Sequence, residues 1–370
     1  MAAPPSAAEE RVSLASNWTL VWWRFRKHRL AMASAVVLIG LYAVVLCPDF
    51  FSTQDPEATE ARLAFIPVQG PWLFEGVRWS PWVPAVVGKR NPTTLRMEWQ
   101  VDPAQKVRVR FFVRGYPYRV LGLLPWSLHL LGAADGDTTG RVHLLGTDRL
   151  GRDQWSRLMH GTQTSMTIGL VAVTLSVVLG VLLGGVSGYF GGLPDLVIQR
   201  LIELLQSLPT IPIWLALTAA LPRDWTPIQV FFAITVILSL VGWTTLGREV
   251  RSRFLALREE DFVLAADLAG CSRARIIARH MVPTFLSHII ATSTLAIPAM
   301  IINETSLSFL GLGIRPPAIS WGVLLQEAQN IQTLALAPWL LIPGLVVILS
   351  VLAFNLVGDG LRDAADPYSH

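Results

Sequence analysis

Residues Thr164 to Tyr189 read TSMTIGLVAVTLSVVLGVLLGGVSGY and contain no charged side chain. An α-helix needs about 20 mainly apolar residues to cross roughly 30 Å of bilayer hydrocarbon, so this stretch is long enough to span a membrane. Its four glycines between Gly180 and Gly188 would allow a second helix to approach closely. The stretch therefore predicts a transmembrane helix that packs against other helices.

Further apolar runs of similar length lie on both sides of it. They cover 30–47, 228–246, 285–302 and 337–357, and a less regular run covers 197–221. The run 197–221 is the ambiguous one, because it carries Arg200, Glu203, Gln206, Pro209 and Pro212. Of the 370 residues, 52% are hydrophobic and 15% are charged, whereas a soluble domain has about 25% charged residues. The composition excludes a soluble single-domain enzyme, a disordered chain and a coiled coil.

The charges between the runs predict the orientation of the chain. The segment 247–283 holds seven Arg and no Lys, whereas 222–227 and 303–336 hold one Arg each. Cytoplasmic loops of membrane proteins are enriched in Lys and Arg, so six spans with a cytoplasmic N-terminus place 247–283 inside. A five-span chain without 197–221 would place this Arg-rich loop outside, and the six-span topology is therefore favoured.

This topology predicts both the fold class and the organisation of the chain. The fold class is an all-α polytopic membrane protein with six transmembrane helices, a short cytoplasmic helix and a small mixed extracytoplasmic insert. The predicted regions are a cytoplasmic N-terminal segment 1–29, an uncleaved first transmembrane helix 30–47, an extracytoplasmic insert 48–163, a five-helix core 164–358 that includes the cytoplasmic loop 247–283, and a cytoplasmic tail 359–370. Both termini are thus expected in the cytoplasm.

The insert contains one clear strand pattern. In Val107 to Gly115, apolar residues alternate with Arg108, Arg110 and Arg114, a period of two that is typical of a half-buried strand. The residues expected on its buried face are Val107, Val109, Phe111 and Val113. The stretch 146–157, which closes the insert, is expected to form an amphipathic helix at the outer surface.

The Arg-rich loop 247–283 contains the helix patterns and helix-stop residues that are typical of a folded segment. Asp261-Phe-Val-Leu-Ala-Ala-Asp-Leu-Ala-Gly270 predicts a short helix that stops at Gly270, because glycine commonly occupies the left-handed position after the last helical residue. A second helix is expected over 273–281, before Pro283. An apolar helical face outside the membrane needs a protein partner; the alternative is a solvated loop with incidental helicity.

Three stretches resemble those of a known family. Leu264-Ala-Ala-x-x-x-Gly270 followed by Pro283 resembles the EAA loop of ABC importer permeases, with Leu264 for the usual Glu and Val282 for the usual Leu. The stretch GTDRLGRDQWSR at 146–157 and the stretch LSFLGLGIRPPAISWG that ends at Gly322 resemble signatures of the dipeptide/oligopeptide/nickel permease group. The resemblance covers about 146–368 and the first span. The long insert is similar to that of the microcin C or oligopeptide permease subset.

The resemblance implies a transmembrane permease subunit of an ATP-driven ABC importer in the bacterial inner membrane. Such a permease pairs with a homologous second permease, two ATPase subunits dock beneath the pair, and an extracytoplasmic substrate-binding protein delivers the cargo, for which peptides are expected. The helix around 261–270 would be the coupling helix. Ala265, Ala266, Gly270 and Pro283 would then couple the chain to the ATPase. The implied partners are these proteins and the lipid bilayer. No nucleic acid partner is implied.

Three polar side chains are candidates for the translocation path: Glu203, Gln206 and Glu304. Ionisable residues inside a membrane are often functional. Local pairing of Glu203 with a neighbouring Arg and a structural role of Glu304 at a helix end are the alternatives. The segment 305–336 is too broken to span, and it is expected to be re-entrant or to lie at the surface, with Trp321 as an interfacial anchor.

The sequence contains no G-x-x-x-x-G-K-[ST] loop, no H-E-x-x-H and no G-x-S-x-G. We therefore expect a transport subunit without its own ATPase site, and we assign no catalytic residue, metal or cofactor. Two other functions remain open at this point. One is a stand-alone secondary transporter or channel, and the other is a membrane-anchored scaffold whose outer insert is the working part.

Overall fold

The computed structural model describes residues 17–75, 78–90, 92, 97–120, 122–134, 142–222 and 224–365. Residues 1–16 of the predicted N-terminal segment and residues 366–370 of the predicted tail lie outside this range. Within it, five helices are long and apolar enough to cross a membrane, and a bent helix pair could supply a sixth span. The predicted class, a mainly helical polytopic membrane protein with a small sheet, is confirmed, and the number of spans is five or six.

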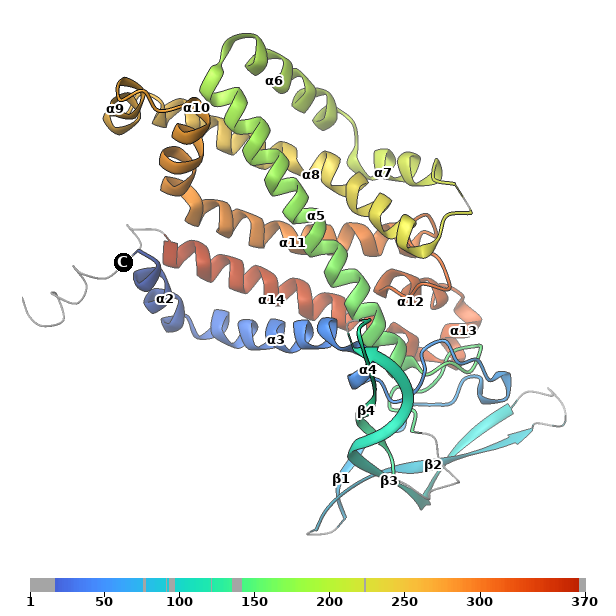
Figure 1. The fold of residues 1–370 in the computed structure, drawn as a ribbon. Helices are drawn as coiled ribbons and strands as arrows, with labels where there is room; N and C mark the ends of the chain where they lie inside the picture. Colours follow the sequence, from blue (N-terminus) through green and yellow to red (C-terminus); the bar gives the residue numbers. More distant parts are fainter. Residues whose placement is uncertain are drawn as a thin grey trace, which may run out of the picture.

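The long helices run side by side in one bundle (Figure 1). They are α3 Arg29–Leu46, α5 Gln154–Phe190, α8 Pro227–Leu257, α11 Leu286–Phe309 and α14 Ile342–Ala365. α5 and α8 pack most extensively. A Cβ on Gly184 would collide with the backbone of Gly247, and one on Gly188 would meet the backbone of Arg251. The glycines of the 164–189 run therefore allow close helix packing, as predicted.

The ambiguous run 197–221 is not one continuous helix. It consists of α6 Gly192–Ser207 and α7 Thr210–Ala219, which are bent by 89° relative to each other. The break falls at Leu208, whose backbone is extended with φ −94° and ψ 140°. Proline disfavours the helical conformation for the residue before it and cannot donate a helix hydrogen bond. Pro209 therefore ends α6 and redirects the chain.

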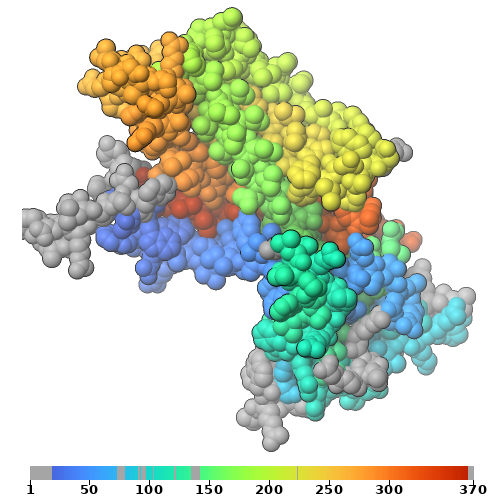
Figure 2. Space-filling model, viewed as in Figure 1, coloured from blue at the N-terminus to red at the C-terminus, as the bar shows by residue number. Residues whose placement is uncertain are grey.

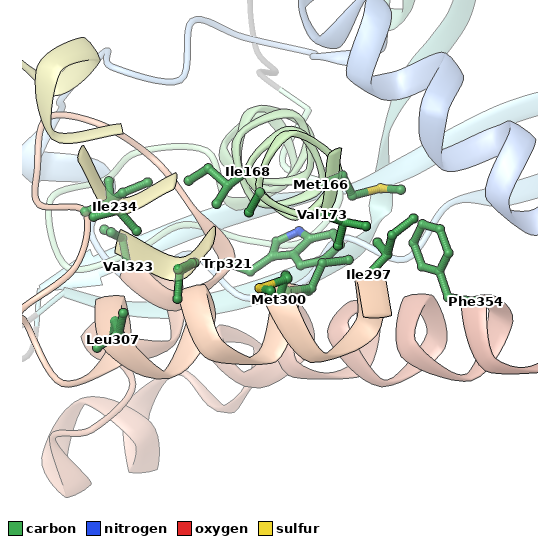
Figure 3. Packing of buried hydrophobic residues seen from close by; sticks show 14 of the residues in the cluster. Met166, Ile168, Val173, Ile234, Ile297, Met300, Leu307, Trp321, Val323 and Phe354 are labelled. Carbon is green, nitrogen blue, oxygen red and sulfur yellow. The ribbon is translucent and has the colours of Figure 1, made fainter. Parts of the chain in front are cut away.

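An apolar core fills the centre of the bundle, between α5, α8, α11, α14 and α12 Trp321–Glu327 (Figure 3). Trp321 is fully buried in this core, and its indole nitrogen donates to Thr162 Oγ1 at 3.1 Å. The expectation that Trp321 is an interfacial anchor is therefore wrong. Thr162 on α5 accepts the indole N–H inside the protein. The indole therefore does not depend on water at the membrane boundary for a hydrogen-bond partner.

Short elements complete the helical part. They are α2 Asn17–Lys27, α4 Pro48–Phe51, η1 Ala61–Leu63, α9 Asp261–Leu268, α10 Arg273–Arg275, the π-helical turn η2 Ile276–Met281, η3 Val282–Phe285, α13 Ile331–Leu336 and η4 Pro338–Leu341. The helix predicted from Asp261 is α9. The second helix predicted in the same loop is formed by α10 and η2 together.

The insert forms a four-stranded antiparallel sheet in the order β1-β2-β3-β4. The strands are β1 Trp72–Glu75, β2 Arg78–Arg90, β3 Met97–Val120 and β4 Leu124–Ala133. β3 pairs with β2 through its first half and with β4 through its second half. The long strand β3 therefore joins the β1–β2 hairpin to β4, the strand that contacts α4.

The strand predicted around Val107 is part of β3. Val107 and Val109 are buried and the three alternating arginines are exposed, as the pattern predicts. Phe111, expected on the buried face, is instead 44% exposed. The segment 142–144 covers the sheet at Val107 and Val109, so the buried stripe is shorter than the alternation of the sequence.

The bundle has two distinct ends in Figure 1. The helices α9, α10 and α2 and the C-terminal part of α14 lie at one end, whereas the sheet, α12 and α13 lie at the other. We call them the α9 end and the sheet end. Each end carries one group of residues with a candidate function.

Candidate functional site

One face of α9 is buried against η2, the turn that leads through η3 into α11. Val263 is 3% exposed and Ala266 is 8% exposed, and both belong to an apolar cluster with η2. Val250 and Phe254 of α8 and Ile289 of α11 are members of the same cluster. α9 therefore packs on η2, and the apolar cluster continues from η2 to α8 and α11.

The rest of the α9 surface is exposed and carries large apolar side chains. Phe262, Leu264 and Leu268 are 41%, 48% and 90% exposed, respectively. Figure 2 shows this part of the chain, in orange, projecting from the α9 end. Large apolar side chains gathered on an exposed surface mark an interaction site. The two candidate alanines divide between the faces, since Ala266 is buried and Ala265 is exposed.

Gly270 ends α9 in the left-handed conformation, with φ +74°. Its N–H donates to the carbonyl of Asp267 at 2.9 Å, and the N–H of Cys271 donates to the carbonyl of Ala266 at 3.1 Å. These two bonds form a Schellman motif, which closes a helix, so the helix stop predicted at Gly270 is confirmed. Pro283, the remaining coupling candidate, is exposed in η3.

Gly270→Ala is expected to destabilise the end of α9 by about 1 kcal/mol, because a left-handed L-residue costs roughly 1–2 kcal/mol. Steric clash adds nothing, since no atom lies within 4 Å of a Cβ at this position. Gly270→Pro should do more, because proline cannot adopt φ +74° and loses the bond to Asp267. Hydrogen exchange of the α9 amides measures both effects.

Gly122→Ala is the matched control for this prediction. Gly122 has φ +72°, its Cβ would also meet no atom within 4 Å, and it lies in the turn between β3 and β4. The substitution introduces the same backbone strain without touching α9, so exchange of the α9 amides should not change. Unchanged exchange in Gly270→Pro would show that Gly270 does not hold the end of α9.

The three candidate path residues do not form one cluster. Glu203 pairs with Arg200 at 2.7 Å on the exposed surface of α6. Gln206, one turn further on, donates to Thr244 Oγ1 at 3.2 Å. Glu304 of α11 is fully buried. Its carboxylate accepts from two serine hydroxyls, those of Ser165 and Ser308, at 2.8 Å each.

A buried ion network at the sheet end is absent from the sequence-based candidates. Arg152 Nε lies 2.7 Å from Asp148 Oδ2, and Arg157 contacts the same carboxylate. Both arginines also reach Glu327 of α12, at 2.7 and 3.1 Å. Arg157 and Asp148 are 1% and 0% exposed. The network joins the start of α5 to α12.

The GTDRLGRDQWSR stretch carries most of this network, but it is not the amphipathic helix expected over 146–157. It is a tight turn as far as Asp153, and α5 begins at Gln154. Asp153 caps α5 by accepting from the Ser156 N–H at 2.8 Å, and its other oxygen lies 3.0 Å from His143 Nδ1. Gly151 allows the turn, because a Cβ there would collide with the carbonyl of Glu60.

Asp49 of α4 connects the first span to the insert. Its Oδ1 accepts from the Tyr116 hydroxyl at 2.9 Å and lies 3.3 Å from His160 Nε2. Partial burial raises the pKa of Asp49, but the hydrogen bond and charge of His160 and the Tyr116 hydroxyl outweigh it, so its pKa lies below the ordinary value. Burial and the neighbouring Asp49 carboxylate raise the pKa of the Tyr116 hydroxyl. The β3 strand is thereby fixed to the sheet end of the bundle.

Residues 154–368 match the family described as the binding-protein-dependent transport system inner membrane component, which is more than half of the 370 residues. The chain belongs to this family. Residues 16–71 match a second description, the N-terminal TM domain of oligopeptide transport permease C. The segment between the two matches, 72–153, contains the sheet.

Individual relatives agree with this assignment. The oligopeptide transport system permease protein OppC of Bacillus subtilis is 35% identical over 226 residues, which cover 61% of this chain and 72% of that protein. The dipeptide transport system permease protein DppC of Alkalihalophilus pseudofirmus is 38% identical over 226 residues, with the same coverage of 61% and 72%. Among solved structures, an inward facing MetNI methionine ABC transporter matches with a TM-score of 0.42 at 15% identity, covering 56% of this chain and 95% of that chain.

The family membership settles the class of the protein. This permease is a membrane-spanning subunit of a binding-protein-dependent ABC transport system, and the predicted resemblance is confirmed. Its relatives are permease components of transport systems, so the alternatives of a stand-alone transporter and of a scaffold are not supported.

Proposed function

We propose that this permease, paired with a homologous second permease, forms the path by which an ATP-driven importer takes up peptides from an extracytoplasmic binding protein. The names of its relatives, which are oligopeptide and dipeptide permeases, support peptides as the cargo. The exposed apolar face of α9 is the observation that carries the proposal, because such a face outside the membrane requires a protein partner.

In this proposal α9 is the coupling helix. Its outer residues Phe262, Leu264 and Leu268 would fill a groove of an ATPase subunit, and its inner residues Val263 and Ala266 transmit the movement. The inner residues share an apolar cluster with η2, α8 and α11, and α8 is in turn packed tightly on α5. ATP-driven closure of the ATPase pair would therefore shift several spans together as a two-state change.

The orientation follows from the same assignment. An ATPase is cytoplasmic, so the α9 end would face the cytoplasm together with α2 and the end of α14, which lie beside it in Figure 1. The sheet end would face outward, toward the binding protein. Both termini would then be cytoplasmic, and ATP would be hydrolysed by the partner subunits rather than by this permease, whose sequence has no nucleotide-binding loop.

The α6 helix is the proposed wall of the path. Glu203 and Gln206 lie on it with exposed side chains, and neither is enclosed by the rest of this chain. We propose that they face the second permease and contact cargo during passage. Glu304 is enclosed between Ser165 of α5 and Ser308 of α11, so its proposed contribution to the path is to hold these two helices in register.

The proposal is tested by isolating the permease from its native membrane in mild detergent and identifying the proteins that accompany it by mass spectrometry. A homologous permease and ATPases with nucleotide-binding loops should be recovered. Ala265→Asp and Ala266→Asp together should remove the ATPases and leave the second permease bound. Recovery of the chain alone, under conditions that keep other ABC importers intact, would contradict the proposal.

A further inference from the structure

The β3–β4 hairpin turns back toward the bundle at the level where the chain enters the membrane. A small pocket is lined on one side by Arg119, Val120 and Gly122 of the hairpin. Its other side is formed by Leu46, the last residue of α3, and by Gln163. The apolar runs of the sequence end at residue 47 and resume at residue 164. The turn of the hairpin thus lies beside the predicted membrane boundary.

The end of this hairpin carries large apolar side chains that the chain itself does not cover. We call residues 119, 120 and 122–126 the hairpin tip. Leu123 is 81% exposed, Leu124 is 64% exposed and Trp126 is 50% exposed. Leu46 beside them is 60% exposed, and Ile39, about two turns earlier on α3, is 69% exposed. The hairpin tip therefore continues the apolar outer surface of the first span, and Figure 2 shows the teal hairpin against the blue helix α3.

The charges of the hairpin have one sign. The stretch 111–134 contains Arg114 and Arg119 and no Asp or Glu. Both arginines are exposed. Basic residues close to a membrane are attracted to anionic lipid headgroups, and tryptophan is enriched at the membrane–water interface. An apolar tip with a tryptophan and flanking arginines has the composition of an interfacial anchor.

The backbone of the hairpin tip is able to enter such a region. The Gly122 N–H donates to the carbonyl of Arg119 at 3.2 Å, and the Leu123 N–H donates to the carbonyl of Val120 at 3.0 Å. Backbone groups without partners are costly in lipid, and these are satisfied within the turn. The hairpin is also held rigidly above the tip, because His129 Nδ1 lies 2.7 Å from the carbonyl of Asp49.

We propose that the hairpin tip is a membrane anchor that places Leu123, Leu124 and Trp126 among the lipid headgroups of the outer leaflet, with Arg119 on their phosphates. The insert is then fixed at two points, the bundle at Asp49 and the lipid surface at the tip. The proposal goes beyond the function proposed above. It rests on the proposed orientation, in which α3 spans the membrane with Leu46 at its outer end, and it holds or fails independently of the cargo.

The test measures collisions of nitroxide labels with oxygen, which is soluble in lipid, and with a nickel chelate, which is soluble in water. Cys47 and Cys271 are free and are first replaced by alanine. Leu123→Cys is then labelled in the assembled transporter, in nanodiscs containing phosphatidylglycerol. Val36→Cys on α3, where the native side chain is 65% exposed, is the membrane reference, and Gln105→Cys on β3 is the water reference.

The label at Leu123 should have an oxygen-to-nickel collision ratio several-fold above that at Gln105 and approaching that at Val36. Leu124→Cys should agree with it, which guards against a single variant that does not assemble. Arg119→Gln, or phosphatidylcholine in place of phosphatidylglycerol, should lower the ratio at Leu123. A ratio equal to that at Gln105 would place the tip in water, and low collision rates with both agents would place it under a protein. Either outcome would overturn the anchor.

Discussion

Leu268→Asp is expected to uncouple this permease from its ATPase while leaving the permease folded. Leu268 is 90% exposed, so the chain itself loses almost no packing when it is replaced. A carboxylate pressed into an apolar docking groove costs about 2 kcal/mol or more, which corresponds to a roughly 30-fold loss of affinity. ATP-dependent uptake into proteoliposomes, and the recovery of ATPase subunits with the purified permease, should fall by at least that factor at limiting ATPase concentration.

Ile331→Asp is the control for this prediction. Ile331 is 82% exposed, and it begins α13 at the sheet end of the molecule. The two substitutions therefore exchange the same kind of exposed aliphatic side chain for the same charge at opposite ends of the bundle. Ile331→Asp should retain the ATPase subunits. Equal retention by Leu268→Asp would mean that the outer face of α9 is not the docking surface.

Arg157→Ala is expected to be the most destabilising single substitution among the charged residues discussed above. Removal of its guanidinium leaves Asp148 buried with one cation in place of two and also takes a partner from Glu327. Removal of one partner from a buried ion pair typically costs about 3–5 kcal/mol, because the remaining charge keeps its desolvation penalty. The thermal unfolding temperature of the detergent-solubilised permease should fall by several degrees.

Arg200→Ala separates this effect from the simple loss of an arginine. Arg200 is paired with Glu203, but the two side chains are 73% and 51% exposed, and exposed pairs contribute about 0–1 kcal/mol. The unfolding temperature of the Arg200→Ala variant should stay close to that of the unchanged protein. The double variant Asp148→Ala/Arg157→Ala should be less destabilised than the sum of its single variants, since the two residues interact directly. Strict additivity would contradict the network.

Much of the fold could be predicted from the sequence because the bilayer restricts what an apolar run can form. A run such as 164–189 must satisfy its own backbone in lipid, and helices do so. The alternation around Val107 and the glycine at 270 are equally local signals, and both identify their elements correctly. Ala265, Ala266, Gly270 and Pro283 could be chosen as coupling residues only because the loop resembles a family motif; their role remains a prediction.

The features that the sequence did not reveal depend on contacts between distant segments. Glu327 pairs with Arg152 and Arg157, although it lies on α12 far along the chain. Trp321 is buried because Thr162 on α5 meets its indole, and no local pattern predicts that pairing. The 89° bend between α6 and α7 has a local cause in Pro209, but its size depends on how the two helices pack on α8.

The most direct test of the central claim is site-specific photocrosslinking from position 268 in native membranes. A photoreactive amino acid replaces Leu268 in one variant and Ile331 in another, and the adducts are identified by mass spectrometry. We predict that the adduct from position 268 contains an ATPase subunit and that the adduct from position 331 does not. Position 268 crosslinking only to lipid, or giving no protein adduct while the transporter is active, would contradict the assignment of α9 as the coupling helix.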